Sequence, residues 1–145
     1  MRLVKIFFLN KLSQMAFKRD YDFGIKKQID LFPTLSAFFG GNITPTTRKM
    51  DPWDYIGDDC VYELKSRTNT YSKYPTTLVG LDKVKENMKK IIFLFNFVDG
   101  LYYIEYEKNL FGTFEKQPFR RFREGVNDKE KPYIYIPIEH LKRIN

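Results

Sequence analysis

Apolar residues recur at helical spacing in the first third of the chain, over residues 22–39. They are separated by four, three, three and four positions, which places them on one face of an α-helix. These residues are Ile25, Ile29, Phe32, Leu35 and Phe39. Pro33 lies inside the pattern and indicates a kink or a break. The Gly40-Gly41-Asn42 run is typical of a helix end.

A second pattern, with a period of two, surrounds Gly57-Asp58-Asp59 in the segment 53–67. It predicts a tight β-hairpin. If Asp58 and Asp59 form the loop, Asp54 lies directly opposite Glu63. Lys65 has the same parity as Glu63 and points to the same face. Directly opposed carboxylates repel, so the pair favours a functional site. The alternative is an exposed hairpin with solvated charges.

The remaining pattern predicts alternating helices and strands. A helix is expected over about 78–90, with Thr76 or Thr77 as its cap. The other expected elements are a buried strand over 91–98, a turn at Asp99-Gly100, a strand over 101–106, an irregular segment over 108–132, a strand over 133–138 and a helix over 139–144. This order predicts one α/β domain over 1–145, with helices packed on a mixed sheet.

Composition and charge limit the kinds of functional site that the chain can form. The chain has 145 residues, of which 43% are hydrophobic, and a net charge of +7. Residues 1–50 carry +6, residues 51–107 carry −3 and residues 108–145 carry +4. An acidic centre between basic ends suits a metal site on a surface that attracts a polyanion. Cys60 and His140 are the single cysteine and histidine, which argues against disulfides, zinc sites and a His-based triad.

The sequence offers neither a membrane-spanning segment nor a signal peptide. We therefore expect an intracellular protein, in the cytoplasm or nucleus and not secreted. Met15 is a second candidate start, which would make residues 1–14 an N-terminal extension. The chain contains no GKS or GKT phosphate loop and no GxGxxG fingerprint, so ATP-driven chemistry is unsupported.

Asp54 followed by Glu63-Leu64-Lys65 resembles the bipartite motif of the PD-(D/E)XK nuclease superfamily. The expected order of helix, two strands, helix and strand over residues 22–107 is similar to that family's core. The wider sequence also resembles small viral or phage nucleases of the resolvase kind. The resemblance implies a restriction-endonuclease-like fold and metal-dependent hydrolysis of a nucleic-acid phosphodiester.

The resemblance also implies roles for individual residues. Asp54, Glu63 and the backbone carbonyl of Leu64 would bind Mg²⁺, or Mn²⁺ in its place. Lys65 would orient or deprotonate the attacking water, or stabilise charge on phosphorus. Gln28 stands on the first helix where related resolvases usually have Glu. Its alternatives are Asp22, Asp30 and a solvated position with no role.

Cations, aromatic rings and hydroxyls elsewhere suit contact with nucleic acid. The candidates are Arg67, Lys73, Tyr74, Thr76, Lys83, Arg120, Arg121 and Arg123. For each, a solvated strand end, turn or loop is the competing interpretation.

We therefore predict a Mg²⁺-dependent DNA nuclease. By analogy with small domains of this kind, the favoured subtype is a structure-selective endonuclease that acts on junctions or branches as a homodimer. One alternative is a catalytically inactive nucleic-acid-binding domain of the same fold, for which Gln28 is the best argument. The other is a structural or host-interaction protein, which would bind neither metal nor DNA.

Overall fold

The first helix is longer than the pattern predicted. A computed structural model of the chain describes residues 2–46 and 50–145. Helix α1 (Arg2–Phe39) contains Pro33 without ending there. The helix expected over 22–39 is confirmed, and residues 2–21 extend it toward the N-terminus. Gly40 and Gly41 both have a positive φ, of 61° and 59°, a conformation that glycine adopts without a Cβ clash and that ends the helix.

A large mixed sheet, here called sheet A, follows α1. Its strands are arranged in the order β1 (Thr44–Pro45), β2 (Tyr55–Ile56), β3 (Cys60–Ser66), β5 (Lys90–Phe97), β6 (Gly100–Glu105) and β9 (Lys142–Arg143). Strands β3 and β5 are parallel, and every other neighbouring pair is antiparallel. The strand and turn expected over 91–106 are confirmed by the β5–β6 hairpin.

A second sheet, sheet B, contains β4 (Thr76–Gly80), β8 (Lys131–Pro137) and β7 (Glu115–Phe119), in that order. Its presence shows that the helix expected over 78–90 is wrong. Thr77 and Val79 are buried while their neighbours are half-exposed, which is the period of a strand and not of a helix. Backbone pairing with β8 stabilises this conformation. Only the short 3₁₀ turn η1 (Leu81–Lys83) follows.

Two further expectations for the last third of the chain need correction. The segment 108–132 is not wholly irregular, since it contains α2 (Lys108–Phe111) and β7. The helix expected over 139–144 is replaced by the 3₁₀ turn η2 (Ile138–His140) and by β9, which pairs with β6. Thr76 and Thr77 lie within β4 and do not cap a helix. The strand expected over 133–138 is confirmed by β8.

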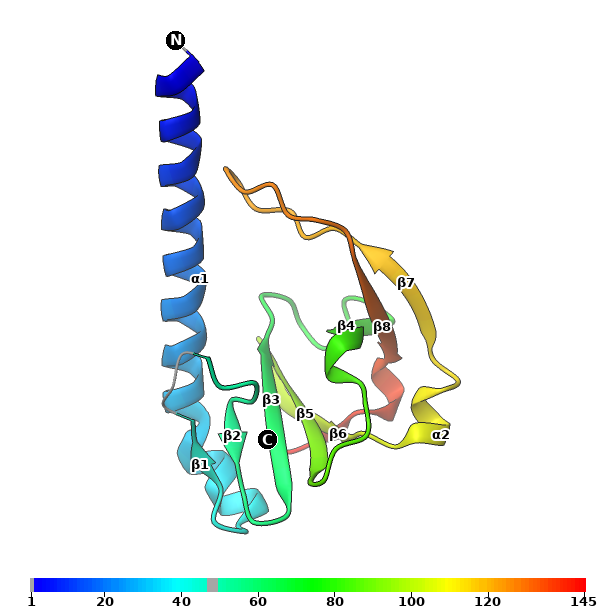
Figure 1. Cartoon of the computed structure of the whole chain (residues 1–145). Coiled ribbons are helices and arrows are strands. Elements are labelled where there is room, and N and C mark those ends of the chain that lie inside the picture. The colour runs from blue at the N-terminus through cyan, green and yellow to red at the C-terminus, as the bar shows by residue number, and fades with distance from the viewer. Residues whose placement is uncertain (1, 47–49) are drawn as a thin grey trace.

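Sheet A lies between two cores (Figure 1). The end of α1 packs on one face, where Leu35, Tyr55 and Leu94 are fully buried. Sheet B packs on the other face, where Phe93, Phe95 and Ile134 are fully buried. Alternate residues of β5 therefore belong to different cores, as the period of a strand requires. The fold is mixed α/β, but in the described part of the chain no α-helix lies between β3 and β5.

The N-terminal part of α1 rises beside the two sheets, and the loop between β7 and β8 reaches across toward it (Figure 1). None of the described helices is both long enough and apolar enough to span a membrane.

Candidate functional site

The hairpin register predicted from the sequence is confirmed from the turn as far as Tyr55 and Tyr62, and a direct Asp54–Glu63 pair stays a prediction. Tyr55 pairs with Tyr62 and Ile56 with Val61. The amide N–H of Asp54 donates to the carbonyl of Tyr62 at 2.9 Å, so Asp54 and Tyr55 both lie against Tyr62, as in a β-bulge, and the regular pairing ends at Tyr55. The two carboxylates are nevertheless close neighbours at the edge of β3, because the negative charge of Asp54 contributes to the raised pKa of Glu63.

Asp54 is held firmly by its own backbone. Its carbonyl accepts hydrogen bonds from the Thr46 amide at 2.9 Å, the Thr46 hydroxyl at 3.1 Å and the Gln28 side-chain amide. Its carboxylate accepts the amide N–H of Leu64 at 2.7 Å. In a β-strand the N–H and C=O of one residue point to the same edge, so the Leu64 carbonyl is directed to the same side as Asp54. The main chain thus fixes the direction of the Asp54 carboxylate.

Gln28 lies close to the site, on α1. It is buried, and its Nε2 donates to the carbonyls of Asp54 and Thr46. The backbone carbonyl of Gln28 accepts a hydrogen bond from the Tyr55 hydroxyl. These contacts make Gln28 a positioning residue that joins α1 to β2. A role as metal ligand stays a prediction.

Two lysines accompany the carboxylates. Lys65 Nζ lies 3.3 Å from one oxygen of Glu63, and Lys83 Nζ lies 3.7 Å from the other. Lys83 also donates to the carbonyl of Pro52 and lies 4.9 Å from the centre of the Trp53 ring. It reaches the site from η1, not from the helix expected there. The structure thus brings Asp54, Glu63, Leu64, Lys65 and Lys83 together.

Burial makes the two carboxylates costly to ionise. It raises the pKa of Asp54, and the Leu64 N–H, Lys65 and Lys83 offset this only in part. Burial also raises the pKa of Glu63, with a further contribution from the negative charge of Asp54, against the opposing effect of the two lysines. Additional positive charge beside the pair would lower this cost.

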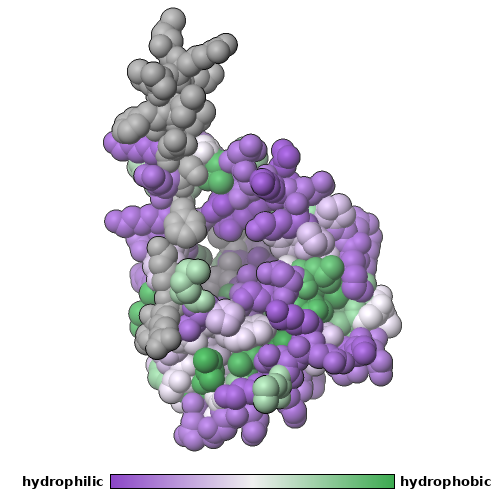
Figure 2. Space-filling model, viewed as in Figure 1, coloured by the Kyte–Doolittle hydropathy of each residue, from purple (hydrophilic) through white to green (hydrophobic). Residues whose placement is uncertain are grey.

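A cavity of about 1000 Å³ opens beyond the carboxyl end of β3, between α1 and sheet B. The space-filling view shows a hollow at this place (Figure 2). Asp54 and Lys65 line the cavity, together with Trp53, Leu64, Ser66 and Arg67. Ligands often bind in open α/β sheets beyond the carboxyl ends of parallel strands, and β3 and β5 are such a pair.

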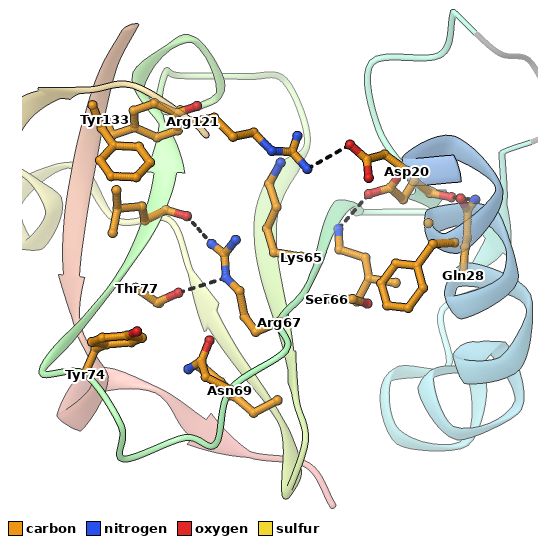
Figure 3. A pocket seen from close by; sticks show the side chains of 18 of the residues that line it. Asp20, Gln28, Lys65, Ser66, Arg67, Asn69, Tyr74, Thr77, Arg121 and Tyr133 are labelled. Atoms are coloured by element: carbon orange, nitrogen blue, oxygen red, sulfur yellow. Dashed lines mark hydrogen bonds and ion pairs between the residues drawn. The ribbon is translucent and has the colours of Figure 1, made fainter. Parts of the chain in front are cut away.

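Arg67 lies in the wall of this cavity. Its Nε donates to the Thr77 hydroxyl at 3.3 Å, and its Nη2 donates to the Leu78 carbonyl at 2.6 Å. Burial lowers the pKa of Arg67, and the positive charge of Arg121 lowers it further. Figure 3 shows Arg67, Lys65 and Arg121 around the same space. The strand parity predicted for Lys65 and Arg67 agrees with this arrangement.

Of the other residues predicted to contact nucleic acid, some line the cavity and some lie outside it. Tyr74, Thr76 and Arg121 line the cavity. Lys73 and Arg120 are exposed and outside its lining, and Lys73 Nζ lies 5.5 Å from the centre of the Tyr74 ring.

Arg123 belongs to an ion-pair cluster that we call the clasp, formed by Asp20, Arg121, Arg123 and Asp128. Arg123 pairs with Asp20 at 2.9 Å and donates to both oxygens of Asp128, at 3.0 and 2.6 Å. Arg121 pairs with Asp20 at 3.3 Å. The clasp therefore joins α1 to the loop between β7 and β8.

Sequence reasoning missed Asp20, Ser66, Tyr133 and Tyr135, all of which line the cavity. Their only local signal is strand parity: Tyr133 and Tyr135 alternate with Ile134 and Ile136, which are buried. Nothing local places Asp20 beside residues 121 and 123.

The donor set suits Mg²⁺ better than zinc. Among the described residues, no group of three or more His, Cys, Asp or Glu side chains is arranged to hold a metal ion. Mg²⁺ commonly takes one or two carboxylates and completes its shell with waters and substrate phosphate. Asp54, Glu63 and the Leu64 carbonyl meet that requirement.

Comparisons with known proteins provide no family for this chain. No family model, curated protein or solved structure matches it.

Proposed function

We propose that the protein is a metal-dependent nuclease that hydrolyses DNA phosphodiester bonds, with a site related to that of the PD-(D/E)XK enzymes. The observation that carries the proposal is the neighbouring carboxylates of Asp54, half-buried, and Glu63, buried, with Lys65 beside them. Such a pair destabilises a fold, and costly ionisable groups grouped at a cavity indicate function.

In this proposal each residue of the site has a separate role. Asp54, Glu63 and the Leu64 carbonyl hold Mg²⁺, which when bound acidifies water and neutralises charge at phosphorus. Lys65 then exchanges its ion pair with Glu63 for a contact to the attacking water or the phosphate. Lys83 remains beside Glu63 and limits the repulsion between the carboxylates. Gln28 and Thr46 keep Asp54 in place.

Cleavage assays test this proposal directly. The full chain is incubated with labelled branched, single-stranded and linear duplex DNA, in Mg²⁺, Mn²⁺ or EDTA. We expect cleavage that requires metal and falls roughly 10²–10⁴-fold in Lys65→Ala, which removes the proton-transfer or charge-stabilising group. Asp54→Asn should lose activity at least as severely. Asp59→Asn, an exposed acid in the same hairpin loop, is the matched control and should retain full activity.

The outcomes separate the alternatives. DNA binding without cleavage in any metal would favour the inactive binding domain. Neither binding nor cleavage would favour a structural or host-interaction protein. Cleavage that Asp54→Asn and Lys65→Ala leave unchanged would refute the proposed site.

A further inference from the structure

Arg67 is a half-buried cation with neutral partners only. Its two hydrogen bonds go to a hydroxyl and a backbone carbonyl, and it also lies 5.9 Å from the centre of the Phe95 ring. No carboxylate pairs with it in the described part of the chain. A buried charge normally has a partner of opposite sign, so the cavity wall offers a place for an anion. A guanidinium binds phosphate particularly well, because its N–H groups form a planar fork.

A second cation faces the same space. Arg121 lines the cavity and is more than half exposed, at 57% of its side chain. Its carboxylate partner Asp20 is shared with Arg123, which binds it more closely, at 2.9 Å against 3.3 Å. Burial lowers the pKa of Arg67, and the positive charge of Arg121 adds to this effect. An anion between the two arginines would relieve their mutual repulsion.

Aromatic rings complete the cavity on the side of sheet B. Tyr74, Tyr133, Tyr135 and Phe119 line it, and Figure 3 shows Tyr74 and Tyr133 on the same side of the cavity as Arg67. Unpaired bases stack on such rings with little dependence on sequence. Paired bases within a duplex do not present their faces.

The size of the cavity also selects for an unpaired strand. A space of about 1000 Å³ has the width of a sphere about 12 Å across, and the major groove of B-DNA alone is about 12 Å wide. The cavity is therefore too narrow to enclose a duplex. The volume lies at the upper end of the range for pockets that enclose a small ligand, which suits one or two nucleotides.

We propose that this cavity binds an unpaired segment of a nucleic-acid strand, with a backbone phosphate held by Arg67 and Arg121 and bases stacked on Tyr74 and Tyr133. The inference deepens the proposed function and rests on it. Arg67 follows Lys65 by two residues on the same face of β3, about 6.6 Å along the strand. The phosphate at Arg67 would thus be next to the phosphodiester at Asp54 and Lys65, so the substrate is single-stranded or locally unpaired.

Binding in EDTA tests this without cleavage. The probe is a thymidine pentanucleotide with a 3′ fluorophore, and anisotropy gives its Kd for the full chain. Arg121→Gln and Arg67→Gln should each weaken binding about tenfold or more, because each removes a charge-assisted contact. Tyr74→Ala should weaken it about tenfold through lost stacking. Arg19→Gln, an exposed arginine on α1 outside the cavity lining, is the matched control and should change Kd less than twofold.

Two competition arms identify what is recognised. Thymidine 5′-monophosphate should displace the probe at least tenfold better than thymidine, since the phosphate contributes the charged contacts. A blunt duplex of the same length should compete poorly. Arg67→Gln also removes the hydrogen bonds from Arg67 to β4, so circular dichroism and a thermal melt accompany each variant. The exposed Arg121 keeps the test decisive if Arg67→Gln fails to fold.

Equal binding by Arg121→Gln and Arg19→Gln, or equal competition by duplex and single strand, would overturn the inference. Failure of the proposed function is distinguishable. A wild-type protein that binds the pentanucleotide through Arg121 but never cuts DNA keeps this inference and refutes the nuclease. If Arg121→Gln cleaves DNA with an unchanged KM, the nuclease is supported and this inference is refuted.

Discussion

Two clusters of charge, the clasp and the carboxylate pair of Asp54 and Glu63, lie near the cavity and differ in how well their charges are satisfied. In the clasp, Arg123 lies between two carboxylates, and its hydrogen bonds to Asp128 and Asp20 raise its pKa. The same contact with Arg123 lowers the pKa of Asp128. Every shift there favours the charged form, as in a cluster that stabilises structure.

The carboxylate pair shows the opposite behaviour. Burial raises the pKa of both acids, and burial lowers the pKa of Arg67 nearby. Each shift disfavours the charged form, although the groups line or adjoin a cavity that a charged ligand can enter. The difference teaches that ion pairs alone do not identify a site. A better indicator of a functional site is a group whose surroundings still disfavour its charged form when all its partners are included.

The largest effect that would sharpen this comparison is expected for Gln28→Glu. If Gln28 positions Asp54 as a donor, the substitution removes that donor and places a carboxylate against two carbonyls in a buried position. We expect a loss of about 2–4 kcal/mol in the free energy of unfolding near neutral pH. Thermal denaturation should show a drop of roughly 5–10 °C for a protein of this size. Gln14→Glu, on the exposed side of α1, is the control.

The same variant tests the family-based role. A first-helix Glu that ligates metal would tighten Mg²⁺ binding, which calorimetry measures. Tighter Mg²⁺ binding with an unchanged melting temperature would contradict the positioning role and support Gln28 as a ligand position.

A smaller effect is expected for the clasp, in Arg123→Gln. The substitution removes the ion pairs that Arg123 makes with Asp20 and Asp128, which should speed local opening of the loop over residues 120–130 roughly tenfold. Hydrogen–deuterium exchange of that loop measures it. Arg120→Gln is the matched control, because Arg120 is exposed on the same loop and has no ion pair among the described residues. Equal exchange in the two variants would show that the clasp does not hold the loop.

The sequence predicted best where structure is local. The pairing of Tyr55 with Tyr62 followed from a short hairpin with alternating flanks, and the β5–β6 hairpin followed from Asp99-Gly100. The helix predicted over 78–90 was wrong because Leu78, Leu81 and Val84 also fit a helical stripe. Pairing of β4 with β8, more than 50 residues later in the chain, decided the conformation instead.

The residues of the candidate site were likewise predictable only where their grouping is local in the chain. Asp54, Glu63 and Lys65 could be grouped from parity alone. Lys83 reaches them from an element of the wrong predicted type, so its selection rested on analogy. The pairing of Asp20 with Arg123 joins residues 103 positions apart, and the neutral partners of Arg67 depend on the contact between the two sheets. Tertiary contacts of this kind leave no periodic pattern in a sequence.

The smallest effect, and the most direct test of the comparison, is a gain of stability in Asp54→Asn. Asn keeps an oxygen that accepts the Leu64 N–H but removes the negative charge that acts on Glu63. We expect the free energy of unfolding to rise by about 0.5–1 kcal/mol near pH 8. The melting temperature should rise by a few degrees, about 2–4 °C per kcal/mol.

The sign of its pH dependence follows from the raised pKa of Asp54. The folded state binds the proton of Asp54 more tightly than the unfolded state does. The contribution of protonated Asp54 to stability is therefore fully present below pH 3.8, the ordinary pKa of the group. It is lost as the pH rises through the raised pKa of the folded state. The advantage of Asp54→Asn should therefore shrink between pH 8 and pH 4, as followed by denaturant titration. Mg²⁺ should stabilise the wild type and not the variant. Asp59→Asn, which leaves the pair intact, should show neither effect. A variant less stable than wild type at pH 8 would mean that Lys65 and Lys83 already satisfy Asp54, and the contrast with the clasp would then disappear.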